Sequence, residues 1–155
     1  MKRSVMAAII SATLLASCTW MPDFWETDSG KDTEPEIPMD EVFGVEELIV
    51  RDFTGDTVWV RGFIVGGLSA DASIDFGCQG DVLGTAVILA DDTGCTEPDD
   101  CLALQLTKKA HKEALGLDKE AVRAATLHHG LYVRGKATTY KKYPALTNLS
   151  DYKLE

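Results

Sequence analysis

The sequence predicts a mainly β domain, a small five-stranded barrel with Greek-key connections and a helical insert between its third and fourth strands. Three observations lead to this fold class. Residues 57–67, 85–90 and 102–106 are apolar runs with strand character. The apolar period changes to helical spacing after residue 107, and strand alternation returns from residue 131. One helical region among five strands disfavours a parallel α/β domain, in which helices alternate with strands.

The first strand is the strongest signal, because its run is rich in β-branched and aromatic residues and ends in a turn-forming Gly-Gly pair. Val58 and Val60 share one face of this strand, which we expect to face the core. Trp59 and Arg61 share the other face, which we expect at or near the surface. Gly62 interrupts the run, and a glycine inside a strand often marks a bulge or a barrel corner.

The next two strands follow a long polar segment. Residues 68–83 contain many turn formers and are expected to be a loop. Residues 85–90 are apolar on both faces, which is typical of a central strand. Residues 102–106 alternate leucine with small or polar residues, which predicts a half-buried strand.

Two short helices are expected after the third strand. Thr107 is the expected N-cap of the first helix, and Gly116 is expected to end it. Asp118 is expected to cap the second helix. The residues expected on the inner side of the two helices are Ala110, Ala114, Leu117, Ala121, Val122 and Ala125.

Two strands complete the predicted fold, over residues 131–138 and 146–154, joined by a loop at residues 140–144. Three strands, a helical insert and two more strands follow the order of the OB-fold, a five-stranded Greek-key barrel. The internal glycine of the long first strand agrees with this fold, because that strand must bend to serve both sides of the barrel. OB-folds bind oligonucleotides and oligosaccharides through their second and third strands and nearby loops.

The loop between the last two strands is the candidate ligand-binding site. Tyr140 and Tyr143 offer rings that stack on bases or sugar faces. Lys141 and Lys142 offer positive charge for an anionic group. The candidate neighbours on outward strand faces are Trp59, Arg61 and Arg134. The opposing interpretation is that the two tyrosines pack on the rim of the barrel.

Five strand segments carry a family resemblance. They are Val-Trp-Val-Arg-Gly-Phe-Ile-Val-Gly (58–66), Ala-Val-Ile-Leu-Ala-Asp (86–91), Cys-Leu-Ala-Leu-Gln-Leu (101–106), Leu-Tyr-Val-Arg-Gly (131–135) and Tyr-Pro-Ala-Leu (143–146). These segments resemble an uncharacterised group of OB-fold-like domains in lipoproteins and secreted proteins of gut-type Gram-negative bacteria. The resemblance covers most of residues 45–155. It implies the fold and transfers no activity and no catalytic residue.

The first 17 residues have the pattern of a lipoprotein signal peptide. Lys2 and Arg3 precede an apolar stretch of about 12 residues, which is shorter than the roughly 20 that a spanning helix needs. The ending Leu-Ala-Ser-Cys resembles a bacterial lipobox, which implies cleavage before Cys18 and lipid attachment to it. We therefore expect a protein of the cell envelope, anchored by lipid, with the outer membrane favoured.

Three parts follow from composition: a signal peptide over residues 1–17, an acidic disordered tether over residues 18–44 and one barrel domain over residues 45–155. Residues 20–47 contain ten acids, one base and three prolines. Such a segment cannot bury enough apolar surface to offset the entropy of the chain. We expect the tether to hold a monomeric domain away from the lipid surface.

Charge also divides the rest of the chain. Residues 48–107 contain ten acids and two bases, whereas residues 108–155 contain ten bases and five acids. The two halves either attract each other across one small domain or leave a basic surface for an anionic partner.

Three cysteines remain once Cys18 is assigned to lipid. In an oxidising compartment two of the three should pair. Cys95 and Cys101 are six positions apart, and a hairpin loop would bring them together, while Cys78 in an earlier loop would replace either one. The resemblance instead implies a bridge between Cys78 and Cys101, since family members carry cysteines near these positions. Zinc is not expected, because no Cys-x-x-Cys motif is present.

No catalytic or cofactor motif is found. His128 and His129 are adjacent, so on a strand they point to opposite sides and cannot chelate one metal ion, and His111 is distant in sequence. We expect no metal and no cofactor. The function expected is a tethered binding module that presents its last loop to a glycan, an oligonucleotide or another ligand. The alternative is a structural lipoprotein whose barrel docks a partner protein of the envelope.

Overall fold

The computed structural model describes residues 34–155. The signal peptide expected over residues 1–17, the lipid-carrying Cys18 and most of the expected tether therefore lie outside the described residues. Within residues 34–155, no helix is both long enough and apolar enough to cross a bilayer.

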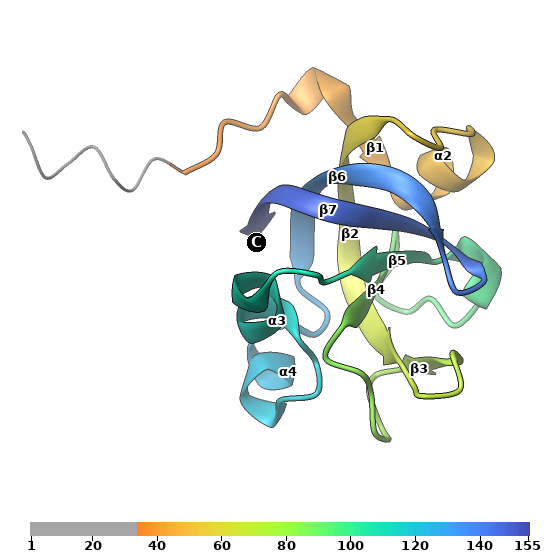
Figure 1. The fold of residues 1–155 in the computed structure, drawn as a ribbon, viewed down its shortest axis with the longest axis vertical. Helices are drawn as coiled ribbons and strands as arrows, with labels where there is room; N and C mark the ends of the chain where they lie inside the picture. Colours follow the sequence, from red (N-terminus) through yellow and green to blue (C-terminus); the bar gives the residue numbers. More distant parts are fainter. Residues whose placement is uncertain (1–33) are drawn as a thin grey trace, which may run out of the picture. The chain divides into compact units, whose positions relative to one another are not determined.

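A seven-stranded mixed sheet forms the body of the domain, which confirms the prediction of a mainly β fold (Figure 1). The strands are β1 (Val42–Gly44), β2 (Thr57–Leu68), β3 (Ile74–Phe76), β4 (Ala86–Ala90), β5 (Leu102–Gln105), β6 (Gly130–Tyr140) and β7 (Tyr143–Leu154). The helices are η1 (Met39–Glu41), α2 (Val45–Val50), η2 (Pro98–Asp100), α3 (Lys109–Leu115) and α4 (Glu120–Thr126). The sheet order is β1-β2-β4-β5-β7-β6, and β3 pairs with β2 beside this path.

Five of the strands close a ring, because β2, the second strand in the order, also pairs with β6, the last one. The first part of β2 pairs with β6 and its second part with β4, so this 12-residue strand serves two neighbours. The pairing of β2 with β4 shifts register between Ile64 and Gly66. The irregularity expected at Gly62 therefore lies two to four residues later. Gly62 itself permits close packing, since a Cβ atom there would lie 2.8 Å from a methyl carbon of Val45.

The interior of the ring is the main hydrophobic core. Val58 and Val60 face it, as the alternation of the first strand predicts. Leu115 and Leu117, from the end of α3 and just after it, join the same cluster. Trp59 lies on the opposite, outward face and belongs to neither hydrophobic cluster.

A second hydrophobic cluster covers the outside of β4 and β5. Ile88 and Ala103 on the outward faces of these strands have no exposed surface, and Phe76 of β3 and Tyr143 of β7 pack in the same cluster. The alternation over residues 102–106 predicts a half-buried strand, but β5 is buried on both faces because this second layer covers it. The loop expected over residues 68–83 contains β3, which contributes to the covering layer.

The helical insert differs in detail from the prediction. Lys108 occupies the N-cap of α3 in place of Thr107, and Lys119 occupies that of α4 in place of Asp118. His111 and Leu115 are the buried residues of α3, so its inner face is rotated from the alanine pattern. Thr126 is the buried residue of α4. Gly116 ends α3 as predicted.

Residues before position 45 take part in the sheet. β1 runs parallel to β2, with Val42 opposite Trp59. α2 follows directly, and the carboxylate of Asp91 accepts hydrogen bonds from the backbone N–H groups of Val45 and Glu46, both at 2.8 Å. Asp91 therefore satisfies two of the free donors at the start of this helix.

Candidate functional site

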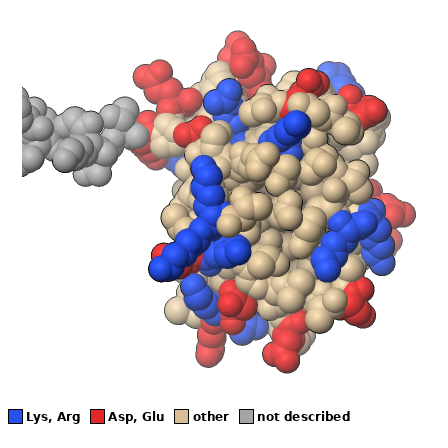
Figure 2. All heavy atoms as spheres, in the orientation of Figure 1, with Lys and Arg blue, Asp and Glu red and all other residues tan. Residues whose placement is uncertain are grey.

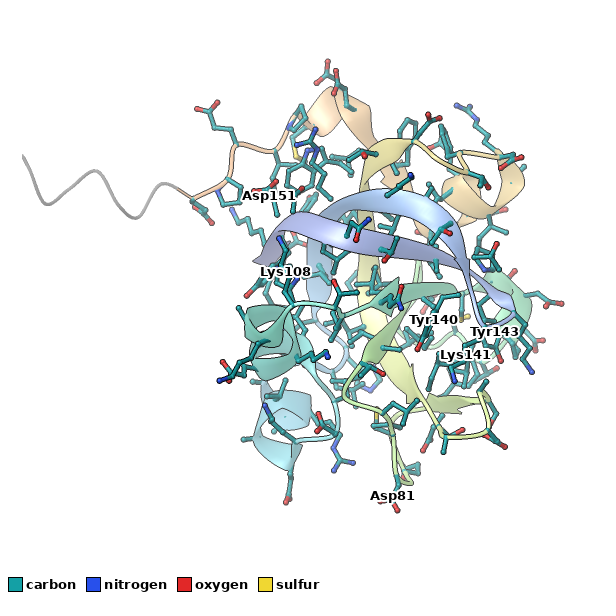
Figure 3. All side chains as sticks on the ribbon, viewed as in Figure 1. Asp81, Lys108, Tyr140, Lys141, Tyr143 and Asp151 are labelled. Atoms are coloured by element: carbon teal, nitrogen blue, oxygen red, sulfur yellow. The ribbon has the colours of Figure 1, made fainter. Side chains whose placement is uncertain are left out.

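A tight hairpin replaces the loop expected over residues 140–144. β6 continues to Tyr140 and β7 begins at Tyr143, so Lys141 and Lys142 alone form the turn. Lys141 has a φ of 60°, in the left-handed region that favours glycine and asparagine. Figure 3 shows Tyr140, Lys141 and Tyr143 grouped at this end of the domain. We call residues 140–143 the hairpin tip.

Tyr143 anchors the hairpin tip. Its side chain is 7% exposed and packs in the outer hydrophobic cluster. Its hydroxyl donates a hydrogen bond of 3.1 Å to the backbone oxygen of Ala72, in the loop between β2 and β3. Tyr140 is partly buried against the same cluster. Tyr143 therefore packs against the domain, as the opposing interpretation of the tyrosines expects, and does not offer its ring to a ligand.

The two lysines of the hairpin tip are exposed. The Lys141 ammonium lies 5.9 Å from the centre of the Tyr140 ring, and the Lys142 ammonium lies 5.4 Å from the centre of the Tyr143 ring. A cation over an aromatic face is attracted to it. The rings therefore favour positions of the ammonium groups beside the tyrosines, with both charges accessible to solvent.

Trp59, Arg61 and Arg134 form a separate group, away from the hairpin tip. Trp59 of β2 lies opposite Arg134 of β6. Arg134 precedes Tyr140 by six residues on the same strand, a separation of about 20 Å at roughly 3.3 Å per residue. The structure thus divides the seven candidate residues into the hairpin tip and an outward face of β2 and β6.

Arg61 is the most constrained of these residues. Its Nε and Nη2 atoms donate to Oε2 of Glu155, at 3.1 and 2.8 Å. Its guanidinium lies 5.0 Å from the ring centre of Phe63 and 5.7 Å from that of Tyr132. Burial lowers the pKa of Arg61, but the hydrogen bond and charge of Glu155 outweigh burial and raise it overall. The local sequence does not indicate the pairing with Glu155, because Glu155 lies 94 residues from Arg61.

A family model for a domain of unknown function, DUF6359, matches residues 43–155. The chain belongs to this family. No curated protein matches it. One matching solved structure is described as a putative aspartyl-tRNA synthetase from Leishmania major Friedlin. It is 8% identical with a TM-score of 0.38, and the match covers 87% of this chain and 25% of that one. A similarity this low does not establish a shared fold.

The three described cysteines of the DUF6359 domain are free thiols. Sγ of Cys95 lies 3.9 Å from Sγ of Cys101, and the backbone oxygen of Glu97 lies near both. Cys78 belongs to the interior cluster, whereas Cys95 and Cys101 belong to the outer one. Burial raises the pKa of Cys101 to about 12 and that of Cys78 to about 11. The structure thus brings together the local pair and places Cys78 in another cluster.

His111 and Asp71 have structural roles in the DUF6359 domain. Among residues 34–155, no group of three histidine, cysteine or acidic side chains is placed to hold a metal ion. His111 is buried and packs edge-on against Tyr152, with ring centres 5.6 Å apart. Asp71 accepts hydrogen bonds from Ser69 and Ser73, which lower its pKa to about 2.

Charge on the DUF6359 domain gathers around an uncharged face. Figure 2 shows this face, with lysine and arginine side chains along two opposite sides of it. Lys141 lies on one of these sides and Lys108 on the other (Figure 3). Four ion pairs join Arg51 to Glu47, Arg61 to Glu155, Lys109 to Glu113 and Arg134 to Asp151. None of these four joins an acid of residues 48–107 to a base of residues 108–155.

Proposed function

We propose that this protein is a lipid-anchored envelope protein whose DUF6359 domain binds an anionic glycan at the hairpin tip. The anchor in this proposal is lipid on Cys18, which follows Leu-Ala-Ser at the end of a short apolar stretch. The acidic residues after Cys18 connect the anchor to the domain. The domain then acts as a module that presents one binding site.

In this proposal the ring of strands is an OB-like Greek-key barrel. Its support is the chain order of the ring, β2, β4, β5, β6 and β7, with α3 and α4 inserted between the third and fourth of these strands. In an OB-fold, ligands meet the second and third strands and the loop joining the fourth and fifth. Here the outer surface of β4 and β5 is covered by the second cluster, whereas the hairpin tip is open.

The observation that carries the proposal is a pair of exposed lysines in a turn that the buried Tyr143 side chain holds in place. The burial of Tyr143 and its hydrogen bond to Ala72 hold the turn, so little entropy is lost when a ligand binds there. Lys141 adopts a left-handed backbone, which costs a non-glycine residue about 1–2 kcal/mol. Strained residues of this kind cluster at functional sites.

An acidic sugar fits this arrangement better than a neutral one or a nucleic acid. The lysines supply two positive charges, and the partly buried Tyr140 ring beside them supplies an apolar surface for a sugar ring. The expected location on a membrane outside the cytoplasm favours glycans over nucleic acids. Because both lysines are exposed, salt should weaken the interaction.

A glycan array with acidic and neutral members, probed with the full chain in detergent, tests the proposal. We expect binding to acidic members, weaker in high salt, and roughly tenfold weaker in a variant with Lys141→Gly and Lys142→Gln. Lys109→Gln with Lys119→Gln is the matched control, because it removes the same charge elsewhere and should bind normally. Single-stranded DNA and membrane protein capture are run beside the array. If the chain binds single-stranded DNA or a membrane protein but binds no acidic glycan on the array, the proposal is contradicted.

A further inference from the structure

We propose that the outward face of β2 and β6 is a docking surface for an acidic, proline-containing, extended peptide of a partner protein. We further infer that residues 35–41 of this chain occupy that surface in the resting state. The face consists of Trp59, Arg61, Tyr132 and Arg134 and is called the aromatic–basic face. Residues 35–41 are called the strap. This surface is distinct from the hairpin tip, so the inference does not depend on the glycan site.

The strap lies beside two outward-facing rings that are buried. Trp59 and Tyr132 are each 8% exposed, although both point away from the interior of the ring. A hollow of about 530 Å³ is lined by Trp59, Arg134 and residues of the strap. Another of about 330 Å³ is lined by Tyr132 and other residues of the strap. The strap, which Figure 1 draws in orange ahead of β1, therefore lies beside both rings and lines the same hollows.

The chemistry of the strap matches the chemistry of the face. The strap carries the acids Glu36, Asp40 and Glu41, the prolines Pro35 and Pro38, and the apolar Ile37 and Met39, with no base. The aromatic–basic face offers two large rings and the guanidinium of Arg134, whereas the guanidinium of Arg61 is already paired with Glu155. Aromatic rings pack against proline and aliphatic side chains, and guanidinium groups bind carboxylates. A peptide with acids, prolines and aliphatic side chains would therefore contact the same rings and the same guanidinium.

The acidic side chains of the strap are exposed, whereas Pro35, Ile37 and Pro38 are half-buried, so another peptide would have to displace only the apolar contacts. Of the described residues, Glu36, Asp40 and Glu41 form no ion pair, and η1 has no buried residue. Met39 is 66% exposed. Arg134 reaches Asp151 at 4.0 Å, the longest of the four ion pairs, so its guanidinium is available to a better carboxylate partner.

Quenching of Trp59 fluorescence measures whether the strap is seated. Trp20→Phe with Trp25→Phe in the full chain, held in detergent, leaves Trp59 as the one tryptophan. In this background, Glu36→Lys, Asp40→Lys and Glu41→Lys together reverse the charge of the strap. We expect stronger quenching by acrylamide in the reversed variant. The matched control reverses Asp23, Glu26 and Asp28 to lysine and should be quenched like the parent.

Peptide binding then measures the docking surface itself. The probe is a fluorescein-labelled peptide of residues 34–41, Glu-Pro-Glu-Ile-Pro-Met-Asp-Glu. It should bind the strap-reversed chain roughly tenfold more tightly than the control chain, because a seated strap competes from the same molecule. Adding Arg134→Glu to the reversed chain should abolish binding, and adding Lys141→Gly should leave it unchanged. Equal binding to the reversed and control chains, or loss with Lys141→Gly, would overturn the inference.

Discussion

Truncation of Tyr143 should destabilise the domain far more than its place in a surface turn suggests. The side chain is 7% exposed, lies in the outer hydrophobic cluster and donates a hydrogen bond to Ala72. Loss of a buried aromatic side chain costs about 3–5 kcal/mol, so we expect Tyr143→Ala to lower the free energy of unfolding by about that amount. Tyr143→Phe removes the hydroxyl alone and should cost about 1 kcal/mol. Tyr140→Ala should cost less than Tyr143→Ala, because Tyr140 is only partly buried.

Urea unfolding followed by circular dichroism measures these differences. At about 4 °C per kcal/mol for a domain near 100 residues, Tyr143→Ala should also lower the melting temperature by more than 10 °C. The order of the losses in free energy of unfolding is the decisive result: we expect the largest loss for Tyr143→Ala and a small loss for Tyr143→Phe. A Tyr143→Ala protein as stable as the parent would show that the tip is not anchored by packing, and the reasoning on the hairpin tip would then be wrong.

Four further predictions follow from burial and placement. Val60→Asp should unfold the domain, as judged by circular dichroism, because the side chain has no exposed surface and its charge would have no partner. Mild oxidation should join Cys95 to Cys101 in non-reducing peptide maps; a bridge to Cys78 would contradict the placement of these thiols. Burial, together with the charge of Lys108, lowers the pKa of His111, so its neutral form supports folding above about pH 6.5 and that support is lost on acidification. Urea unfolding of the parent and His111→Phe at about pH 7.5 and pH 5 checks this, and an unchanged pH dependence would refute it. Cys18→Ala should release the protein from membranes, and retention after that change would exclude lipid on Cys18.

The core of the ring was predictable because strand alternation is a local signal. Val58 and Val60 face one side of β2, and one buried side is enough to fix which residues point inward. The second layer was not predictable, because it depends on contacts between distant segments. Tyr143 reaches Ala72, 71 residues away, and nothing in the local pattern of either residue indicates the contact.

The candidate site was predicted as one cluster and is divided in the structure. The tip was expected as a loop. A two-residue turn is not evident from its sequence, because Lys141 and Lys142 are not the glycine or asparagine that marks such a turn. Trp59 faces away from the interior of the ring, as predicted, but it is buried and not at the surface. An acidic composition predicts disorder over residues 35–41 and gives no indication that Val42–Gly44 pairs with β2.

The affinity of the parent and Lys141→Gly proteins for an acidic oligosaccharide, measured together with their stability to urea, tests the central claim most directly. Glycine relieves the left-handed backbone of Lys141 and removes one charge, so the account predicts unchanged or higher stability with about threefold weaker binding, half in free energy of the loss expected when both lysines are replaced. Equal affinity in the two proteins, with stability unchanged, would contradict the claim that the hairpin tip is the binding site.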